Sequence, residues 1–126
     1  MDKWELERRT KAFALRVVRF VAAWPRNKVG DVIGYQLLKS GTSIGANYRE
    51  ANRAESRNDF AHKIGIVEKE AAETQYWLEL CEEAGVGDES ECRWLLDESG
   101  ELLAIFTRTG KTIRQRNAKV EYRNSN

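Results

Sequence analysis

Residues 40–57, SGTSIGANYREANRAESR, decide the fold of this chain. Apolar side chains recur in this stretch at helical spacing, yet glycines, small hydroxyls and an asparagine lie between them. A helix built for stability alone avoids these residues, because an interior glycine costs about 0.5–1 kcal/mol relative to alanine. The stretch therefore indicates a helix that either packs closely against a neighbour or binds something polar.

The helix predicted to contain this stretch spans residues 28–53 and has three distinct faces. Its core line comprises Ile33, Leu37, Ile44, Tyr48 and Ala51. One flank carries Gly30, Gly34, Gly41 and Gly45, which predicts the close approach of a second helix. The other flank carries Gln36, Ser40, Ser43, Asn47 and Glu50, polar groups that need partners if they are buried.

Three further amphipathic helices are predicted, over residues 5–23, 57–84 and 89–117, with a frayed basic tail to residue 126. With short loops between them, the four helices form a single domain, residues 1–126. The expected fold is all-α, an antiparallel up-down-up-down four-helix bundle.

Cap and turn residues set these boundaries. Pro25 ends the first helix, because the residue before a proline is pushed out of the α region, and Gly85 is a common helix stop. Asn27, Ser56 and Asp88 are the expected N-caps of the helices that follow.

A structural polar network is predicted between the second and third helices. Its members are Gln36, Ser40, Ser43, Asn47, Glu70 and Thr74. The favoured interpretation is a network that fixes helix register or subunit pairing. The alternative is a buried site for a small ligand or a cation.

Charge is distributed unevenly along a chain whose net charge is only +1. Residues 1–26 carry seven Lys or Arg against three acids, and residues 102–126 carry six against one. Residues 59–101 carry thirteen acids against three bases. If the two ends of the chain meet on one side of a bundle, they form a basic face.

Two groups of arginines are the nucleic-acid-binding candidates. The first helix carries Arg8, Arg9, Arg16 and Arg19 within about a third of its circumference. The end of the second helix carries Arg49, Arg53 and Arg57. Both groups are suited to nucleic-acid phosphates or an acidic partner, and the alternative is an ordinary solvated basic surface.

The first helix also carries a second apolar strip, formed by Leu15, Val18 and Ala22, on the side that faces away from the core. A helix that is apolar on two sides usually has two packing partners. In a domain of this size, the second partner is expected to be another subunit.

Enzymatic sites are not indicated by the sequence. His62 is the only histidine, which leaves no zinc set and no Ser/His/Asp arrangement. Cys81 and Cys92 fit no metal spacing and are expected to be reduced, buried thiols, with a disulfide as the less favoured alternative. We therefore expect no enzyme activity, no metal and no cofactor. The chain shows no basic-then-apolar leader and no long apolar run, so we expect a cytoplasmic location and no membrane association.

The opening stretch, Asp59-Phe60 and residues 68–78 together resemble a known family. These are the small proteins first noticed as reading frames inside intervening sequences of bacterial 23S ribosomal RNA genes. The resemblance spans about Thr10 to Arg114, with Ala51 where many members have glycine. The residues that carry it are Gln36, Ser40, Ser43, Asn47, Glu50, Phe60, Glu70, Glu73, Thr74 and Leu78.

This resemblance implies a four-helix bundle that assembles into a homopentameric ring. The related accessory variability determinant of diversity-generating retroelements is a basic pentamer that binds nucleic acid and a reverse transcriptase. The expected function is therefore a non-enzymatic oligomeric adaptor for nucleic acid or a ribonucleoprotein, such as ribosomal RNA or a reverse-transcriptase complex. The alternatives are a protein–protein scaffold that binds no nucleic acid and a small-ligand-binding bundle.

Overall fold

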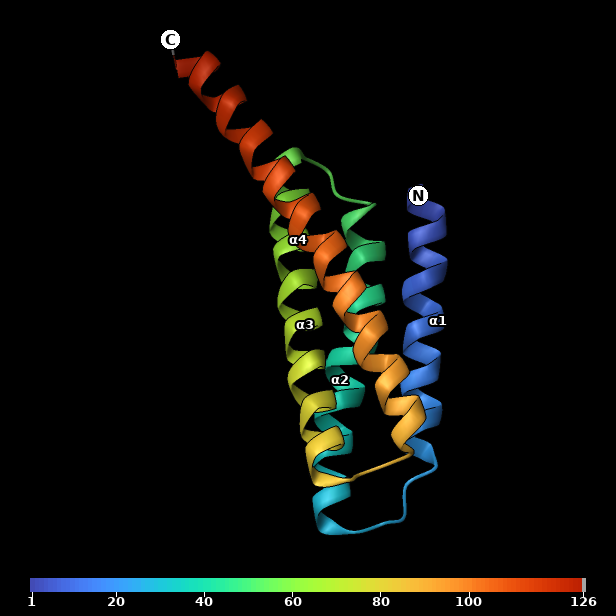
Figure 1. The fold of residues 1–126 in the computed structure, drawn as a ribbon. Coiled ribbons are helices and arrows are strands. Elements are labelled where there is room, and N and C mark those ends of the chain that lie inside the picture. The colour runs from blue at the N-terminus through green and yellow to red at the C-terminus, as the bar shows by residue number, and fades with distance from the viewer. Residues whose placement is uncertain (126) are drawn as a thin grey trace.

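The computed structural model describes residues 1–125 of the chain, and this part contains four helices and no strand (Figure 1). The helices are α1 (Lys3–Ala22), α2 (Lys28–Ala51), α3 (Arg57–Ala84) and α4 (Glu89–Ser125). Each helix packs against the next, and α1 also contacts α4, less extensively. The all-α class and the four-helix bundle are thus confirmed. No helix within residues 1–125 has the length and apolar character needed to span a bilayer.

Side-chain caps begin all four helices. The oxygens of Asp2, Asn27, Ser56 and Asp88 accept hydrogen bonds from the backbone N–H three residues later, at 2.8–3.0 Å. The three caps expected from the sequence are therefore confirmed. Gly85 ends α3 with φ of 70°, a left-handed conformation that suits glycine.

The core is formed by the apolar lines of the four helices. Its largest fully buried apolar side chains include Phe13, Leu37, Ile44, Ile64, Leu78, Leu95, Leu102 and Phe106. Cys81 and Cys92 lie in the same core as free thiols, as expected. Burial, followed by the charge of Cys92, raises the pKa of Cys81 to about 12, so this thiol stays protonated.

The glycine flank of α2 faces α1, and it allows the close approach that the sequence predicts. A Cβ atom on Gly41 would lie 3.1 Å from Cγ1 of Val17, and one on Gly45 would lie 3.1 Å from Oγ1 of Thr10. Both neighbours are fully buried. The opening stretch is thus a packing surface for α1 along this flank.

The polar flank of α2 does not form the expected network with α3. Ser40 Oγ donates to the carbonyl of Gln36, and Asn47 Nδ2 donates to that of Ser43. In α3, Thr74 Oγ1 donates to the carbonyl of Glu70. Within residues 1–125 these groups bond inside their own helices, because a hydroxyl or amide in a helix readily reaches the carbonyl four residues earlier.

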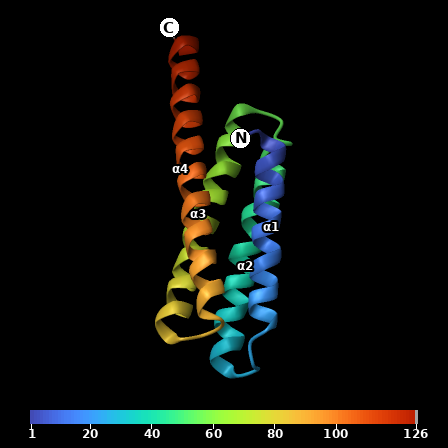
Figure 2. The same ribbon diagram turned by 45° about the vertical axis from the view of Figure 1, so that its right-hand side comes forward.

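Helix α4 is longer than the sequence pattern predicts. It continues to Ser125, where an end near residue 117 and a frayed tail were predicted. Contacts with the start of α3 explain the extension, since Asn117 Nδ2 donates to the carbonyl of Arg57 at 3.1 Å and Ile113 and Val120 are half-buried. Gly110 is the last buried residue of α4. Residues 111–125, here named the basic arm, pass the start of α3 and extend beyond it in both views (Figures 1 and 2).

Candidate nucleic-acid interface

Arg9, a predicted nucleic-acid ligand, is bound within the protein. Its Nε and Nη2 atoms donate to the two carboxylate oxygens of Glu98 at 2.8 and 2.7 Å, and Nη2 also donates to Glu101 at 2.9 Å. The hydrogen bonds from Arg9 hold the pKa of Glu98 below its usual value. This guanidinium is therefore neutralised by α4 and is not available to a phosphate.

Arg16, further along α1, is also paired with a carboxylate of α4. It donates two hydrogen bonds to the carboxylate of Glu91, at 2.9 and 2.8 Å. Its guanidinium carbon also lies 3.4 Å from the centre of the Trp94 ring, a cation–π contact. Arg9 and Arg16 together fasten α1 to α4, and neither fits the predicted binding role.

The other two arginines of α1, Arg8 and Arg19, are exposed and form no salt bridge within residues 1–125. They do not act as one surface, because Arg8 lies near the N-terminus and Arg19 borders a hollow at the opposite end of α1, beside Phe20 and Trp24. The single arginine face predicted for the first helix is therefore divided in the structure.

The arginines at the end of α2 also separate. Arg49 lies 3.5 Å from a carboxylate oxygen of Glu7, and Arg53 borders a shallow hollow beside Glu7 and Lys11. Arg57 lies across the α2–α3 turn and faces α4 instead. Of the three, Arg57 has the surroundings richest in positive charge.

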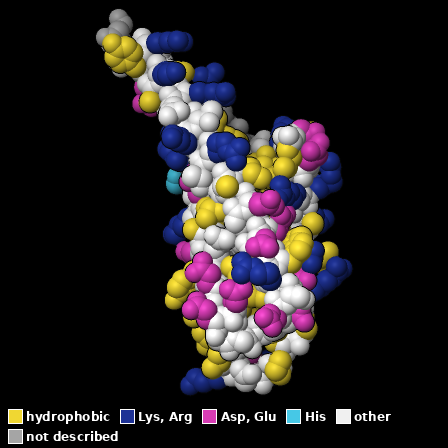
Figure 3. All heavy atoms as spheres, viewed as in Figure 1, with side chains coloured by type: hydrophobic (Ala, Val, Ile, Leu, Met, Phe, Trp, Pro, Cys, Tyr) yellow, Lys and Arg dark blue, Asp and Glu magenta, His cyan; other side chains and the backbone are white. Residues whose placement is uncertain are grey.

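The up-down topology gathers positive charge at one end of the bundle. The start of α1, the end of α2, the start of α3 and the end of α4 all lie there (Figure 1). The basic chain ends predicted to meet therefore do lie at the same end. Acidic side chains gather instead on the lower half of the face in Figure 3, while Lys and Arg mark the arm.

The basic arm carries a group of positively charged side chains that lies outside the predicted binding candidates. It contains Lys111, Arg114, Arg116, Lys119 and Arg123 against one acid, Glu121. Arg114 lies 3.2 Å from Glu68 of α3, and the other four form no salt bridge within residues 1–125. The charge count of residues 102–126 could have indicated this surface, but only the continuous helix places these basic side chains on one element.

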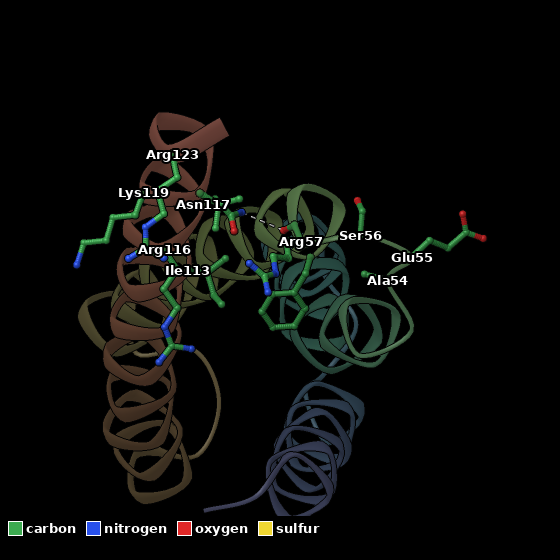
Figure 4. A pocket seen from close by; sticks show the side chains of 11 residues that line it. Ala54, Glu55, Ser56, Arg57, Ile113, Arg116, Asn117, Lys119 and Arg123 are labelled. Atoms are coloured by element: carbon green, nitrogen blue, oxygen red, sulfur yellow. Dashed lines mark hydrogen bonds between the residues drawn. The ribbon is translucent and has the colours of Figure 1, made fainter. Parts of the chain in front are cut away.

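A cleft lies between the arm and the start of α3, and we name it the basic cleft (Figure 4). It encloses about 630 Å³. It is lined by Ala54, Glu55, Ser56, Arg57, Phe60, Ile113, Arg116, Asn117, Lys119, Val120 and Arg123. Its lining holds four basic side chains and one acidic side chain, so the cleft is suited to an anion. The basic cleft and the arm are therefore the strongest candidate for a nucleic-acid interface.

Comparison with known proteins agrees with this architecture. Residues 2–108 match the family model of the 23S rRNA-intervening sequence protein, so the match ends before the basic arm. A crystal structure of a protein with unknown function from the S23 ribosomal protein family of Bacteroides thetaiotaomicron VPI-5482 is 35% identical, with a TM-score of 0.80. That similarity covers 88% of this chain and 99% of the other. No curated protein matches the chain. The chain belongs to the 23S rRNA-intervening sequence protein family.

Proposed function

We propose that this protein is a non-enzymatic, oligomeric adaptor that binds nucleic acid or a ribonucleoprotein through its basic end. Ribosomal RNA and a reverse-transcriptase complex are the partner classes that its family relationships suggest. The observation that carries the proposal is the basic arm, in which four of five bases have no acidic partner within residues 1–125. Lysine and arginine side chains without an acidic partner are available to neutralise nucleic-acid phosphates.

The low net charge of +1 does not weaken this proposal. Charges separated by more than about 8 Å are largely screened at physiological ionic strength. A polyanion therefore responds to the charge of the surface that it contacts and not to the net charge of the protein. The thirteen acids of residues 59–101 include those that neutralise Arg9 and Arg16 in α1. The basic end, by contrast, keeps a local excess of positive charge.

The test compares two double variants that remove the same charge from opposite ends of the bundle. Arg116→Ala/Lys119→Ala changes the arm, and Arg26→Ala/Lys28→Ala changes the α1–α2 turn and the first residue of α2. Fluorescence anisotropy with structured RNA and duplex DNA at about 50 mM salt should show an affinity loss of about tenfold or more for the arm variant only. Equal losses for both variants, or no binding by the wild type, would contradict the proposal.

We further propose that the protein forms a homo-oligomer, a pentamer by its resemblance to the family, through the outer face of α1 and α2. Leu15 and Val18 of α1 and Val32 and Tyr35 of α2 are exposed apolar side chains on these helices. A groove of about 390 Å³ between the two helices is bordered by Tyr35 and Leu38, among others. Exposed apolar side chains beside an open groove favour a contact with a second protein surface.

Light scattering tests the assembly with two tyrosines of similar exposure. Tyr35 is 64% exposed on α2 and Tyr76 is 56% exposed on α3. Tyr35→Glu should shift the protein toward smaller species at micromolar concentration, and Tyr76→Glu should not. A wild-type monomer at that concentration would contradict the oligomer.

A protein–protein scaffold without nucleic-acid binding is the second candidate, and the same apolar face favours it. Co-purification from the native host separates the two functions. The adaptor should bring nuclease-sensitive material with it, whereas a scaffold should bring only protein. The third candidate, a small-ligand site around Asn47 and Glu70, is least supported, because the Asn47 amide already donates within its own helix.

A further inference from the structure

The basic cleft has an apolar floor as well as basic walls. Phe60 from α3 and Ile113 and Val120 from α4 are half-buried and line it, and Phe60 also packs against the core. A volume of about 630 Å³ lies within the range of sites for small organic molecules, about 300–1,000 Å³. A phosphate alone needs no such floor, so the cleft is suited to an anion with a flat apolar body.

The positive charge around this floor is not cancelled. Arg57, Arg116, Lys119 and Arg123 form no salt bridge within residues 1–125. The single acid, Glu55, turns its carboxylate away from the arm, whereas Arg57 extends from the first turn of α3 toward α4 (Figure 4). The hydrogen bonds from Asn117 to Arg57 and Asn58 hold the two walls together.

We infer that the basic cleft binds one unpaired nucleotide of the nucleic-acid partner. The nucleobase lies on the apolar floor of the cleft, where the ring of Phe60 and the guanidinium plane of Arg57 offer stacking surfaces. The flanking phosphates lie against Arg116, Lys119 and Arg123. A base within a regular duplex stays in its stack, so the cleft selects single strands, bulges and ends.

This inference rests on the proposed function and deepens it, and two matched variants test it. Val120→Glu places a carboxylate at the cleft floor. Ala118→Glu places the same charge on the same helix at an exposed residue outside the cleft lining. The probes are one RNA hairpin, the same hairpin with a single-nucleotide bulge, a single strand of equal length, and the DNA version of each, measured by fluorescence anisotropy.

The wild type should bind the bulged and single-stranded probes about tenfold more tightly than the regular hairpin, since one stacked base contributes about that much. Val120→Glu should abolish this preference. Ala118→Glu should weaken all probes equally and keep it. Salt-dependent binding without any preference would overturn the inference and leave the proposed function standing, whereas no binding to any probe would overturn both.

The other candidate occupant of the cleft is a second copy of the chain. The assembly state of the two variants tests this alternative. Both variants should sediment as the wild type does. If Val120→Glu alone changes the oligomer, the cleft is a subunit contact, and the inference is overturned.

Discussion

Arg9 of α1 and Glu98 of α4 form a two-pronged ion pair, with N–O distances of 2.8 and 2.7 Å. The pair is partly shielded, since the side chains are 27% and 13% exposed. It joins the first and last helices, which contact each other less extensively than sequential helices do. An arginine that the sequence presents as a phosphate ligand thus serves to close the bundle.

Arg9→Ala should therefore lower stability. It leaves the half-buried carboxylate of Glu98 without its partner, which costs about 1–3 kcal/mol. The neighbouring Arg8 is exposed and forms no salt bridge within residues 1–125, so Arg8→Ala should change the free energy of unfolding by less than about 0.5 kcal/mol. Urea denaturation measures the free energy of unfolding of both variants. Equal losses of stability would contradict the structural role of Arg9.

The same pair gives stability a defined pH dependence. Arg9 holds the pKa of Glu98 below its usual value in the folded state. A lowered carboxylate pKa contributes stability that is present above the unfolded-state pKa, about 4.3, and lost as pH falls through the folded-state pKa. In thermal melts from pH 7 to about 3, the melting temperature of Glu98→Gln should fall less than that of the wild type. Parallel curves would mean that Glu98 does not contribute.

Two glycines test the close approach of α1 to α2. A Cβ on Gly45 would lie 3.1 Å from Oγ1 and 3.3 Å from the backbone carbon of buried Thr10, whereas one on Gly65 in α3 would meet nothing within 4 Å. Gly65→Ala should stabilise by about 0.5–1 kcal/mol through helix propensity. Gly45→Ala should destabilise, because the backbone of α1 must move. If both variants stabilise equally, the helices are not in close contact at Gly45.

The two thiols should resist modification in the native protein. Cys81 and Cys92 are 1% and 2% exposed, and burial raises the pKa of both, for Cys81 to about 12. The reactive thiolate is therefore nearly absent at neutral pH. Ellman's reagent should label neither thiol until denaturant unfolds the chain, when both react. Rapid labelling of the native protein would place at least one thiol at the surface.

Much of the fold could be predicted because local patterns determine it. Asn27, Ser56 and Asp88 cap their helices as expected, since capping involves residues only three positions apart. The glycine flank of α2 was predictable for the same reason. The hydrogen-bond partner of each polar side chain was not predictable in this way. Ser40, for example, donates to a carbonyl of its own helix and does not bond to α3.

The site was less predictable because it depends on contacts distant in sequence. A helical pattern shows that Arg9 and Arg16 share a face, but it does not show that Glu98 and Glu91 lie opposite them. The sequence predicts the helix of the arm only as far as residue 117 and a frayed tail beyond it, because a local pattern does not show the contacts with the start of α3. Arg57 was a candidate in the sequence, and only the fold places it beside that arm.

The most direct test of nucleic-acid binding by the basic arm is its salt dependence. The logarithm of the association constant for duplex DNA should fall linearly with the logarithm of salt concentration. Arg116→Ala/Lys119→Ala should reduce the slope by about 2, one for each phosphate contact removed, and Arg26→Ala/Lys28→Ala should leave it unchanged. An arm variant with the wild-type slope would contradict the account.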